Sequence, residues 1–195
     1  MLISRDREKL VNAIVYFADN TRYCGKTKLF KLLYLLDFHH FRDVGRSVTG
    51  LDYHAWKNGP VPFALVQEWD DFEPDLAAAV DVVPERVIDF DRQRLVPKIA
   101  FDDSHFTKRE LRLMQDIAER HRDEMTKPLI GLTHEERGPR DKIWDGGRGN
   151  NERIPYVLAV PDDAPNREAI LEAARNYQGF KSADRISPAA QSLLG

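Results

Sequence analysis

The residues Gly25-Lys26-Thr27 have the types that end a phosphate-binding loop, in which backbone amides surround the phosphates and a lysine reaches the outer ones. The complete motif also needs a glycine five positions earlier, and this chain has Asn20 there. It further needs a preceding strand, whereas the residues before Gly25 have the spacing of a helix. We therefore expect no nucleotide binding at this segment.

Side chains with metal-ligand potential lie together at Asp37, His39 and His40, with His54 farther along the chain. His39 and His40 would point about 100° apart around a helix, so only Asp37 and His40 share a face. The single cysteine, Cys24, supplies no thiolate cluster and no internal disulfide. We predict neither a metal nor another cofactor, with the histidines packed or solvated near a helix end.

Three histidines, His54, His121 and His134, are candidates for a general base. The sequence contains no Gly-x-Ser-x-Gly nucleophile elbow, and Cys24 lacks the surroundings of a catalytic thiol. The leading prediction is a protein that is not an enzyme, in which His134 is buried and hydrogen-bonded. A hydrolase with an unfamiliar site around His54 and His134 is the alternative from another functional class.

Positive charge gathers at the start and along one side of an apolar segment, at Arg22, Lys26, Lys28 and Lys31, with Lys57 close if the next segment packs beside it. Such a patch would suit an acidic protein surface or RNA phosphates. The other interpretation is a solvated face that keeps an apolar helix soluble.

The segment Trp56-Lys57-Asn58-Gly59-Pro60 combines an aromatic residue, a charge and a rigid turn. Binding hot spots are built from residues of this kind. The structural interpretation places Trp56 in the core beside a tight turn at Asn58-Gly59-Pro60. Both interpretations hold if one edge of the indole stays exposed.

The elements that must position these residues begin with two helices. Ser4 can cap the first, whose apolar residues recur at helical spacing. The second, over Lys26–Phe41, is apolar on nearly all its faces and should form the centre of the core, and Gly45 should end it.

Extended structure is predicted next. Residues 47–57 form a short segment of β-prone residues, which predicts an extended conformation. Pro62 suits the first turn of another helix. Residues 80–99 predict an antiparallel hairpin with its polar turn at Asp91-Arg92-Gln93-Arg94, and Pro84 and Pro97 confine both arms to sheet edges.

The remaining signals are helical or irregular. Thr107-Lys108-Arg109-Glu110 fits a capping box at a helix start. Residues 129–144 read as rich in loops, and a last helix over 166–177 should turn Ile170, Ala173 and Tyr177 inward.

Length and composition favour one domain. The expected elements indicate a mainly α (α+β) class, with helices packed around a central buried helix and a small antiparallel β element. The chain has 195 residues, of which 42% are hydrophobic, and a net charge of -3 that disfavours nucleic-acid binding. No apolar run is long enough for a membrane span, so we expect a cytoplasmic protein. We predict a domain over 1–180 and a tail over 181–195.

Three pieces of the chain, taken in order, resemble the sequence blocks of the Panacea (SocA-like) antitoxin domain. They are Lys28-Leu29-Phe30-Lys31-Leu32-Leu33-Tyr34, Ala55-Trp56-Lys57-Asn58-Gly59-Pro60-Val61-Pro62 and Leu132-Thr133-His134-Glu135, and the resemblance spans residues 8 to 177. The third block departs from the family pattern, because Gly138-Pro139-Arg140 intervenes where a Pro-Trp pair is usual and Trp144 comes late.

The resemblance implies a helical antitoxin of a bacterial or prophage toxin-antitoxin system. It would neutralise a cognate toxin by direct binding or, alternatively, act as an adaptor that delivers the toxin to a protease. The residues assigned to partner binding are Lys28, Lys31, Tyr34, Trp56, Lys57, Asn58, Gly59, Pro60, His134 and Trp144.

Overall fold

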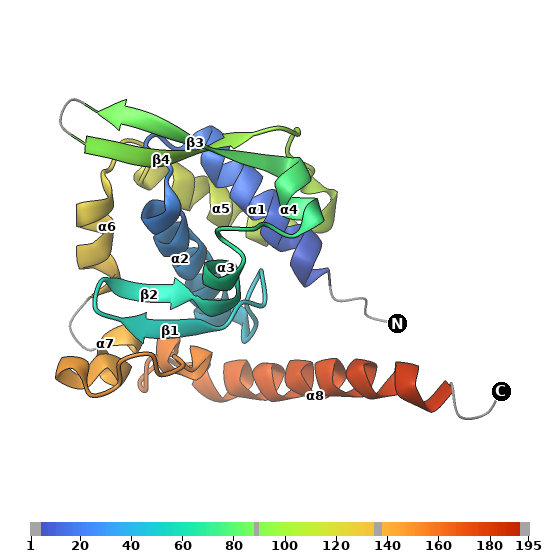
Figure 1. The fold of residues 1–195 in the computed structure, drawn as a ribbon. Coiled ribbons are helices and arrows are strands. Elements are labelled where there is room, and N and C mark those ends of the chain that lie inside the picture. The colour runs from blue at the N-terminus through green and yellow to red at the C-terminus, as the bar shows by residue number, and fades with distance from the viewer. Residues whose placement is uncertain (1–4, 88–89, 135–137, 192–195) are drawn as a thin grey trace.

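The computed structural model describes residues 5–87, 90–134 and 138–191, and its elements surround one central helix (Figure 1). The helices are α1 (Asp6–Asn20), α2 (Lys26–Val44), α3 (Phe63–Gln67), α4 (Pro74–Ala79), α5 (Lys108–Arg120), α6 (Thr126–Thr133), α7 (Pro139–Trp144) and α8 (Arg167–Gln191). The strands are β1 (Tyr53–Trp56), β2 (Gly59–Pro62), β3 (Val80–Val87) and β4 (Phe90–Pro97). Short 3-10 turns lie at Asp103–His105, Asp145–Gly147 and Tyr156–Ala159. The predicted mainly α class is therefore confirmed.

Helix α2 is the central helix that the sequence predicts. It is buried along nearly its whole length and packs against α1, α5, α6 and β2. Gly45 ends it in the left-handed conformation, as predicted, with φ of 73°. A Cβ at this position would collide with the backbone of α8 at Ile170, so the glycine also lets α8 approach closely. Ser4, the predicted cap of α1, lies outside the described residues.

Strands β1 and β2 form a tight antiparallel hairpin in which Trp56 pairs with Gly59. The turn therefore falls at Lys57 and Asn58, and the prediction of a turn at Asn58-Gly59-Pro60 is corrected by one residue. On its other side β1 exchanges backbone hydrogen bonds with residues 151–154, including Asn151 N to Ala55 O at 2.8 Å. Strand β1 is thus held along both of its edges.

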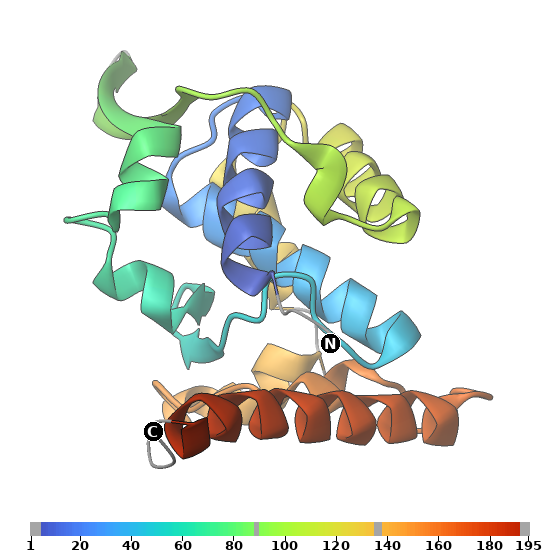
Figure 2. The ribbon, with the colours of Figure 1, turned by 90° about the vertical axis from the view of Figure 1, so that its right-hand side faces the viewer.

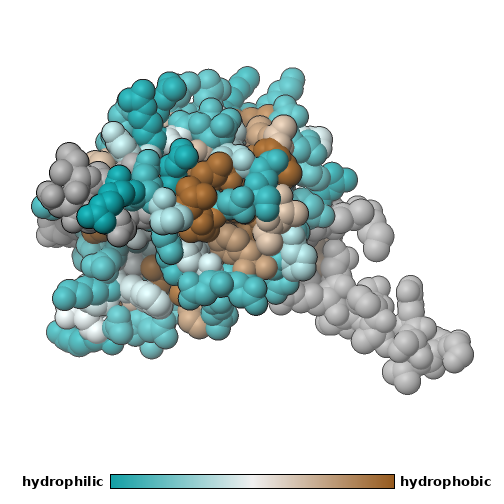
Figure 3. Space-filling view, turned by 45° about the horizontal axis from the view of Figure 1, so that its top comes forward, coloured by the Kyte–Doolittle hydropathy of each residue, from teal (hydrophilic) through white to brown (hydrophobic). Residues whose placement is uncertain are grey.

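Strands β3 and β4 form the second hairpin, and Val87 pairs with Phe90. The hairpin is as predicted, but its register is not, because Asp91 to Arg94 belong to β4 and do not form the turn. Continuous backbone pairing outweighs the local preference of polar residues for a turn. Seen from the β3–β4 side, hydrophobic groups lie among a larger number of hydrophilic ones (Figure 3).

Later elements confirm one prediction and correct two. The capping box is present, since Glu110 N is bonded to the Thr107 hydroxyl and Thr107 N to the Glu110 carboxylate. Residues 129–144, expected to be rich in loops, contain most of α6 and all of α7. The last helix runs to Gln191, through most of the predicted tail, and buries Ala174 where Ala173 was expected.

Helix α8 lies across one side of the body and continues beyond it (Figures 1 and 2). A small cluster attaches its first half, in which Ile170 and Ala174 meet Phe41 and Val160. Among the described residues, no helix is both long and apolar enough to cross a membrane.

Candidate functional site

The tip of the β1–β2 hairpin presents the most exposed part of the predicted partner-binding set. Trp56 is 37% exposed, and Lys57 and Asn58 are exposed beside it. The indole is held in place, because Trp56 Nε1 donates to Asn151 Oδ1 at 3.0 Å. The prediction that Trp56 lies in the core is wrong, because its ring is braced by one hydrogen bond and remains open to solvent on the other side.

Lys31 supports the hairpin from beneath. Its ammonium is buried and Nζ donates to Pro60 O at 2.8 Å. Burial, together with the charge of Arg140, lowers the pKa of Lys31 to about 7. Gly59, with φ of 100°, brings the backbone so close that a Cβ there would lie 2.7 Å from Lys31 Nζ and 2.9 Å from His134 Nε2. Glycine is therefore required at this position on both conformational and steric grounds.

Arg140 supports the same turn from α7. It is buried, and its Nη2 donates to Trp56 O at 2.6 Å and to Lys57 O at 3.3 Å. Its guanidinium stacks on the ring of Trp144, with Cζ 4.4 Å from the ring centre. The sequence did not point to Arg140, because an arginine in an expected loop carries no signal of burial. Trp144 contributes to the site by holding this arginine.

His134 follows α6 and bonds to the backbone of Asn58. Desolvation lowers the pKa of His134, and the charges of Arg140 and Lys31 lower it further, so this environment favours the neutral imidazole. The expectation of a hydrogen-bonded histidine is confirmed, although the ring is only partly buried. Together Lys31, His134 and Arg140 fix the backbone of the turn from three separate elements.

Lys28 is far from the surface that the sequence suggested. It is fully buried, and its ammonium donates to four backbone carbonyls, those of Arg22, His121, Arg122 and Glu124, at 2.7 to 3.2 Å. The prediction that Lys28 and Lys31 belong to a solvated or partner-facing patch is therefore wrong for both side chains. Lys28 lies where irregular backbone leaves carbonyl groups without partners in a helix or sheet, and Lys31 binds a carbonyl of strand β2.

Tyr34 is also buried and belongs to an aromatic group. Its ring lies 4.2 Å from that of Phe38 and 5.5 Å from that of Tyr53, between ring centres. Of the ten residues predicted to bind a partner, Trp56, Lys57 and Asn58 are exposed. The remaining members lie in the support beneath the hairpin or deeper in the core.

The histidine and carboxylate pair considered for metal binding serves structure. Asp37 is fully buried and accepts hydrogen bonds from Val48 N, Thr49 N, the Thr49 hydroxyl and the Tyr53 hydroxyl. Desolvation raises its pKa, and these donors act in the opposite direction. His40 Nδ1 lies 2.8 Å from Arg46 O. Within the described part of the chain, no group of three metal-ligating side chains comes together.

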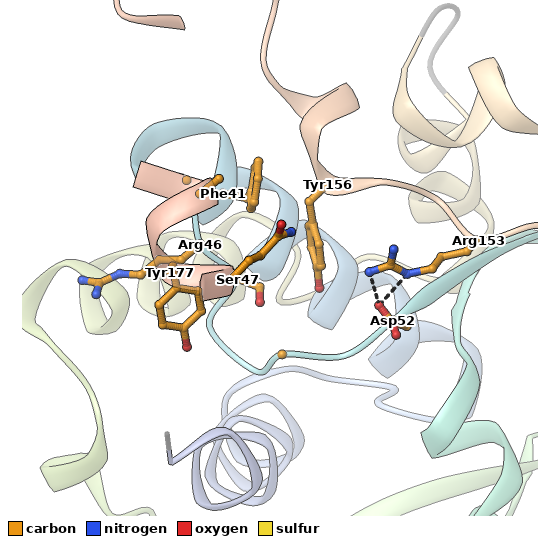
Figure 4. Close-up of a pocket in the computed structure, with 11 residues that line it drawn as sticks. Phe41, Arg46, Ser47, Asp52, Arg153, Tyr156 and Tyr177 are labelled. Atoms are coloured by element: carbon orange, nitrogen blue, oxygen red, sulfur yellow. Dashed lines mark hydrogen bonds and ion pairs between the residues drawn. The ribbon is translucent and has the colours of Figure 1, made fainter. Parts of the chain in front are cut away.

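A pocket of about 350 Å³ lies between the end of α2, the loop that follows it and α8 (Figure 4). Phe41 stacks on Tyr156 at 5.3 Å between ring centres, and Tyr177 approaches from α8. Arg153 binds Asp52 at 2.7 Å across its floor. The aromatic stack and the ion pair attach the segment at 153–156 to α2 and to the loop that follows it. We therefore interpret the side chains around this pocket as structural contacts.

A model of the antitoxin family described as SocA-like, with a Panacea domain, matches residues 29–139. The chain belongs to this family. The match covers more than half of this SocA-like chain and includes the hairpin tip, Lys31 and His134, whereas Lys28 lies just before it and Arg140 and Trp144 just after. The resemblance over residues 8 to 177 is thus borne out over its central part. Neither the curated proteins nor the solved structures contain a match to the chain.

Proposed function

We propose that this SocA-like protein neutralises a cognate bacterial or prophage toxin by direct binding, and that the β1–β2 hairpin tip makes the central contact. It would act in the cytoplasm and without catalysis of its own. The family membership supports a toxin as partner. The observation that carries the choice of surface is an exposed tryptophan on a turn held by Lys31, Arg140 and His134.

The rigidity of the β1–β2 hairpin tip favours binding. A contact on a flexible loop loses affinity because side chain and backbone must be ordered when the complex forms. Here the indole is fixed by Asn151, and Arg140 fixes the backbone at the start of the turn. An exposed tryptophan that is already ordered is the residue type with the largest contribution at protein interfaces.

Coexpression with the product of the neighbouring open reading frame tests the proposal. Trp56→Ala should weaken the complex at least 30-fold, which corresponds to about 2 kcal/mol, and should abolish rescue of growth. Ile99→Ala is the matched control, because Ile99 is another exposed hydrophobic residue, on the β4 side. The proposal fails if the neighbouring product is harmless alone, if the two proteins do not copurify, or if Trp56→Ala rescues as well as the wild type.

An adaptor that delivers the toxin to a protease is the second candidate, and the length of α8 favours it. The helix continues to Gln191, beyond the small cluster that attaches its first half. Deletion of residues 182–195 should then stop toxin degradation while leaving toxin binding intact. Unchanged degradation would remove this segment from the mechanism.

The enzymatic alternative has a separate test. His54 Nδ1 lies 2.7 Å from Asn151 O, and His134 bonds to the Asn58 backbone through one ring nitrogen, while its buried Nε2 has no hydrogen-bond partner among the described residues. A folded His54→Ala, His134→Ala double variant should still rescue growth. Loss of rescue with toxin binding retained would favour catalysis.

A further inference from the structure

A second surface lies where the starts of α2 and α6 meet, and it carries two large exposed hydrophobic residues. Tyr23 is 39% exposed and Met125 is 47% exposed. Both line a hollow of about 400 Å³, and Lys26 and Lys127 line it with them. Adjacent exposed hydrophobic side chains next to a hollow mark a place for another molecule.

Buried Lys28 brings the two halves of this surface together. Its ammonium binds Arg22 O from the loop that carries Tyr23, and His121 O, Arg122 O and Glu124 O from the loop that carries Met125. Arg22 N also donates to Arg122 O at 2.8 Å. The positions of Tyr23 and Met125 are therefore fixed relative to one another before any partner arrives.

The backbone at Tyr23 has a strained conformation. Its φ is 60°, in the left-handed region that costs a residue with a Cβ roughly 1 kcal/mol and that glycine or asparagine adopts more readily. Tyr23 keeps this conformation although 39% of the residue is exposed. Strain of this kind is typical of positions kept for binding.

Asp123 and Glu124 near the hollow are paired with Arg22 and His121, and the charged residues that line the hollow itself have one sign. Its described lining includes Lys26 and Lys127 and no carboxylate. Lys26 is held with its ammonium 5.2 Å from the ring centre of Trp69. The first amides of α2 and α6 add partial positive charge, and neither Gly25 nor Met125 supplies a side-chain cap to them. An apolar centre with positive surroundings matches an apolar segment that carries acidic residues.

We propose that this hollow binds an acidic, amphipathic segment of the toxin, with an apolar side chain between Tyr23 and Met125 and carboxylates against Lys26 and Lys127. The inference rests on the proposed antitoxin function and extends its interface. Helix α6 connects the two surfaces along one edge of the molecule, from Met125 at its start to His134 beside the hairpin tip (Figure 1). A partner that contacts the hairpin tip can therefore reach the hollow along α6.

Tyr23→Asn separates binding from folding. Asparagine tolerates the left-handed conformation, so the variant should melt at the same temperature as the wild type or higher, while its toxin affinity falls at least tenfold. Lys26→Glu with Lys127→Glu should weaken the complex at least tenfold and flatten its dependence on salt. Ile99→Asn, at an exposed position away from the hollow, is the control and should leave affinity unchanged.

A second measurement does not need the toxin. Two synthetic helical peptides are added to the full chain and followed by amide NMR shifts. Both carry leucine at positions i, i+3, i+4 and i+7, and the opposite face carries glutamate in one peptide and lysine in the other. The acidic peptide should shift Tyr23, Gly25 and Met125, and the basic peptide should not. Equal shifts with both peptides, or shifts confined to other surfaces, would overturn the proposal.

The outcomes separate the two proposals. Toxin bound with wild-type affinity by both Tyr23→Asn and the double lysine variant would remove the hollow and leave the antitoxin function standing. If the neighbouring protein is harmless but the acidic peptide still binds selectively, the antitoxin function is refuted and the hollow remains a binding site for an acidic segment. Dimerisation of the free chain that Tyr23→Asn abolishes would assign the hollow to a second copy and overturn the proposed occupant.

Discussion

Replacing Lys31 by methionine should change how the stability of the protein depends on pH. Lys31 is almost completely buried, and burial lowers its pKa from 10.5 to about 7. One unit of pKa corresponds to about 1.4 kcal/mol, so keeping this ammonium charged in the interior costs roughly 4 to 5 kcal/mol. The cost is fully present below pH 7, where both the folded and the unfolded chain carry the proton.

Above pH 7 the folded protein releases this proton while the unfolded chain keeps it up to about pH 10. Because the unfolded state then binds more protons, the free energy of unfolding rises with pH. For one group with these pKa values the gain is about 2 kcal/mol between pH 7 and pH 9. Lys31→Met removes the gain, so the stability of the wild type relative to the variant should increase by this amount.

Urea unfolding at pH 7, 8 and 9 measures the difference, and this range lies above most histidine titration. The variant also leaves Pro60 O without its donor, which lowers its stability by a constant amount and does not alter the slope. Lys57→Met, at the exposed hairpin tip, is the matched control and should run parallel to the wild type. If the free energies of unfolding of Lys31→Met and the wild type change with pH in parallel, the protonation of Lys31 does not differ between the folded and unfolded states and the reasoning is refuted.

Three further changes test the supports of the fold. Gly59→Ala should lower the free energy of unfolding, measured with urea, by about 2 kcal/mol or more. About 1 kcal/mol comes from the positive φ and the rest from contact of the new methyl group with Lys31 and His134. A change under about 0.5 kcal/mol would contradict the geometry. Asp37→Asn should lower the free energy of unfolding by about 2 to 4 kcal/mol, because the NH₂ group of the new side chain would face the hydrogen-bond donors of Val48, Thr49 and Tyr53. Amide hydrogen exchange in the loop at 47–52 should accelerate, and unchanged exchange would refute this role of Asp37. Thr107→Ala should lower stability by about 1 kcal/mol through loss of the helix cap, whereas Thr107→Ser should retain most of it in the same assay.

Several features of the fold follow from short stretches of sequence. The capping box at Thr107 and Glu110 and the glycine that ends α2 depend on neighbours within one helical turn, so their signals are complete in the sequence. The central place of α2 follows equally from its apolar residues on nearly every face. The register of β3 and β4 does not follow, because pairing between strands outweighs the turn preference of the residues at 91–94.

The candidate site divides in the same way. The sequence alone determined that a tryptophan, a lysine and a glycine meet in one turn, because these residues are adjacent. Only the tertiary structure decided that Lys28 and Lys31 are buried and that Arg140 lies beneath Trp56. The groups that accept from Lys28 include carbonyls 93 to 96 residues away in the chain. A lysine is buried when folding supplies such acceptors, and local sequence holds no information about them.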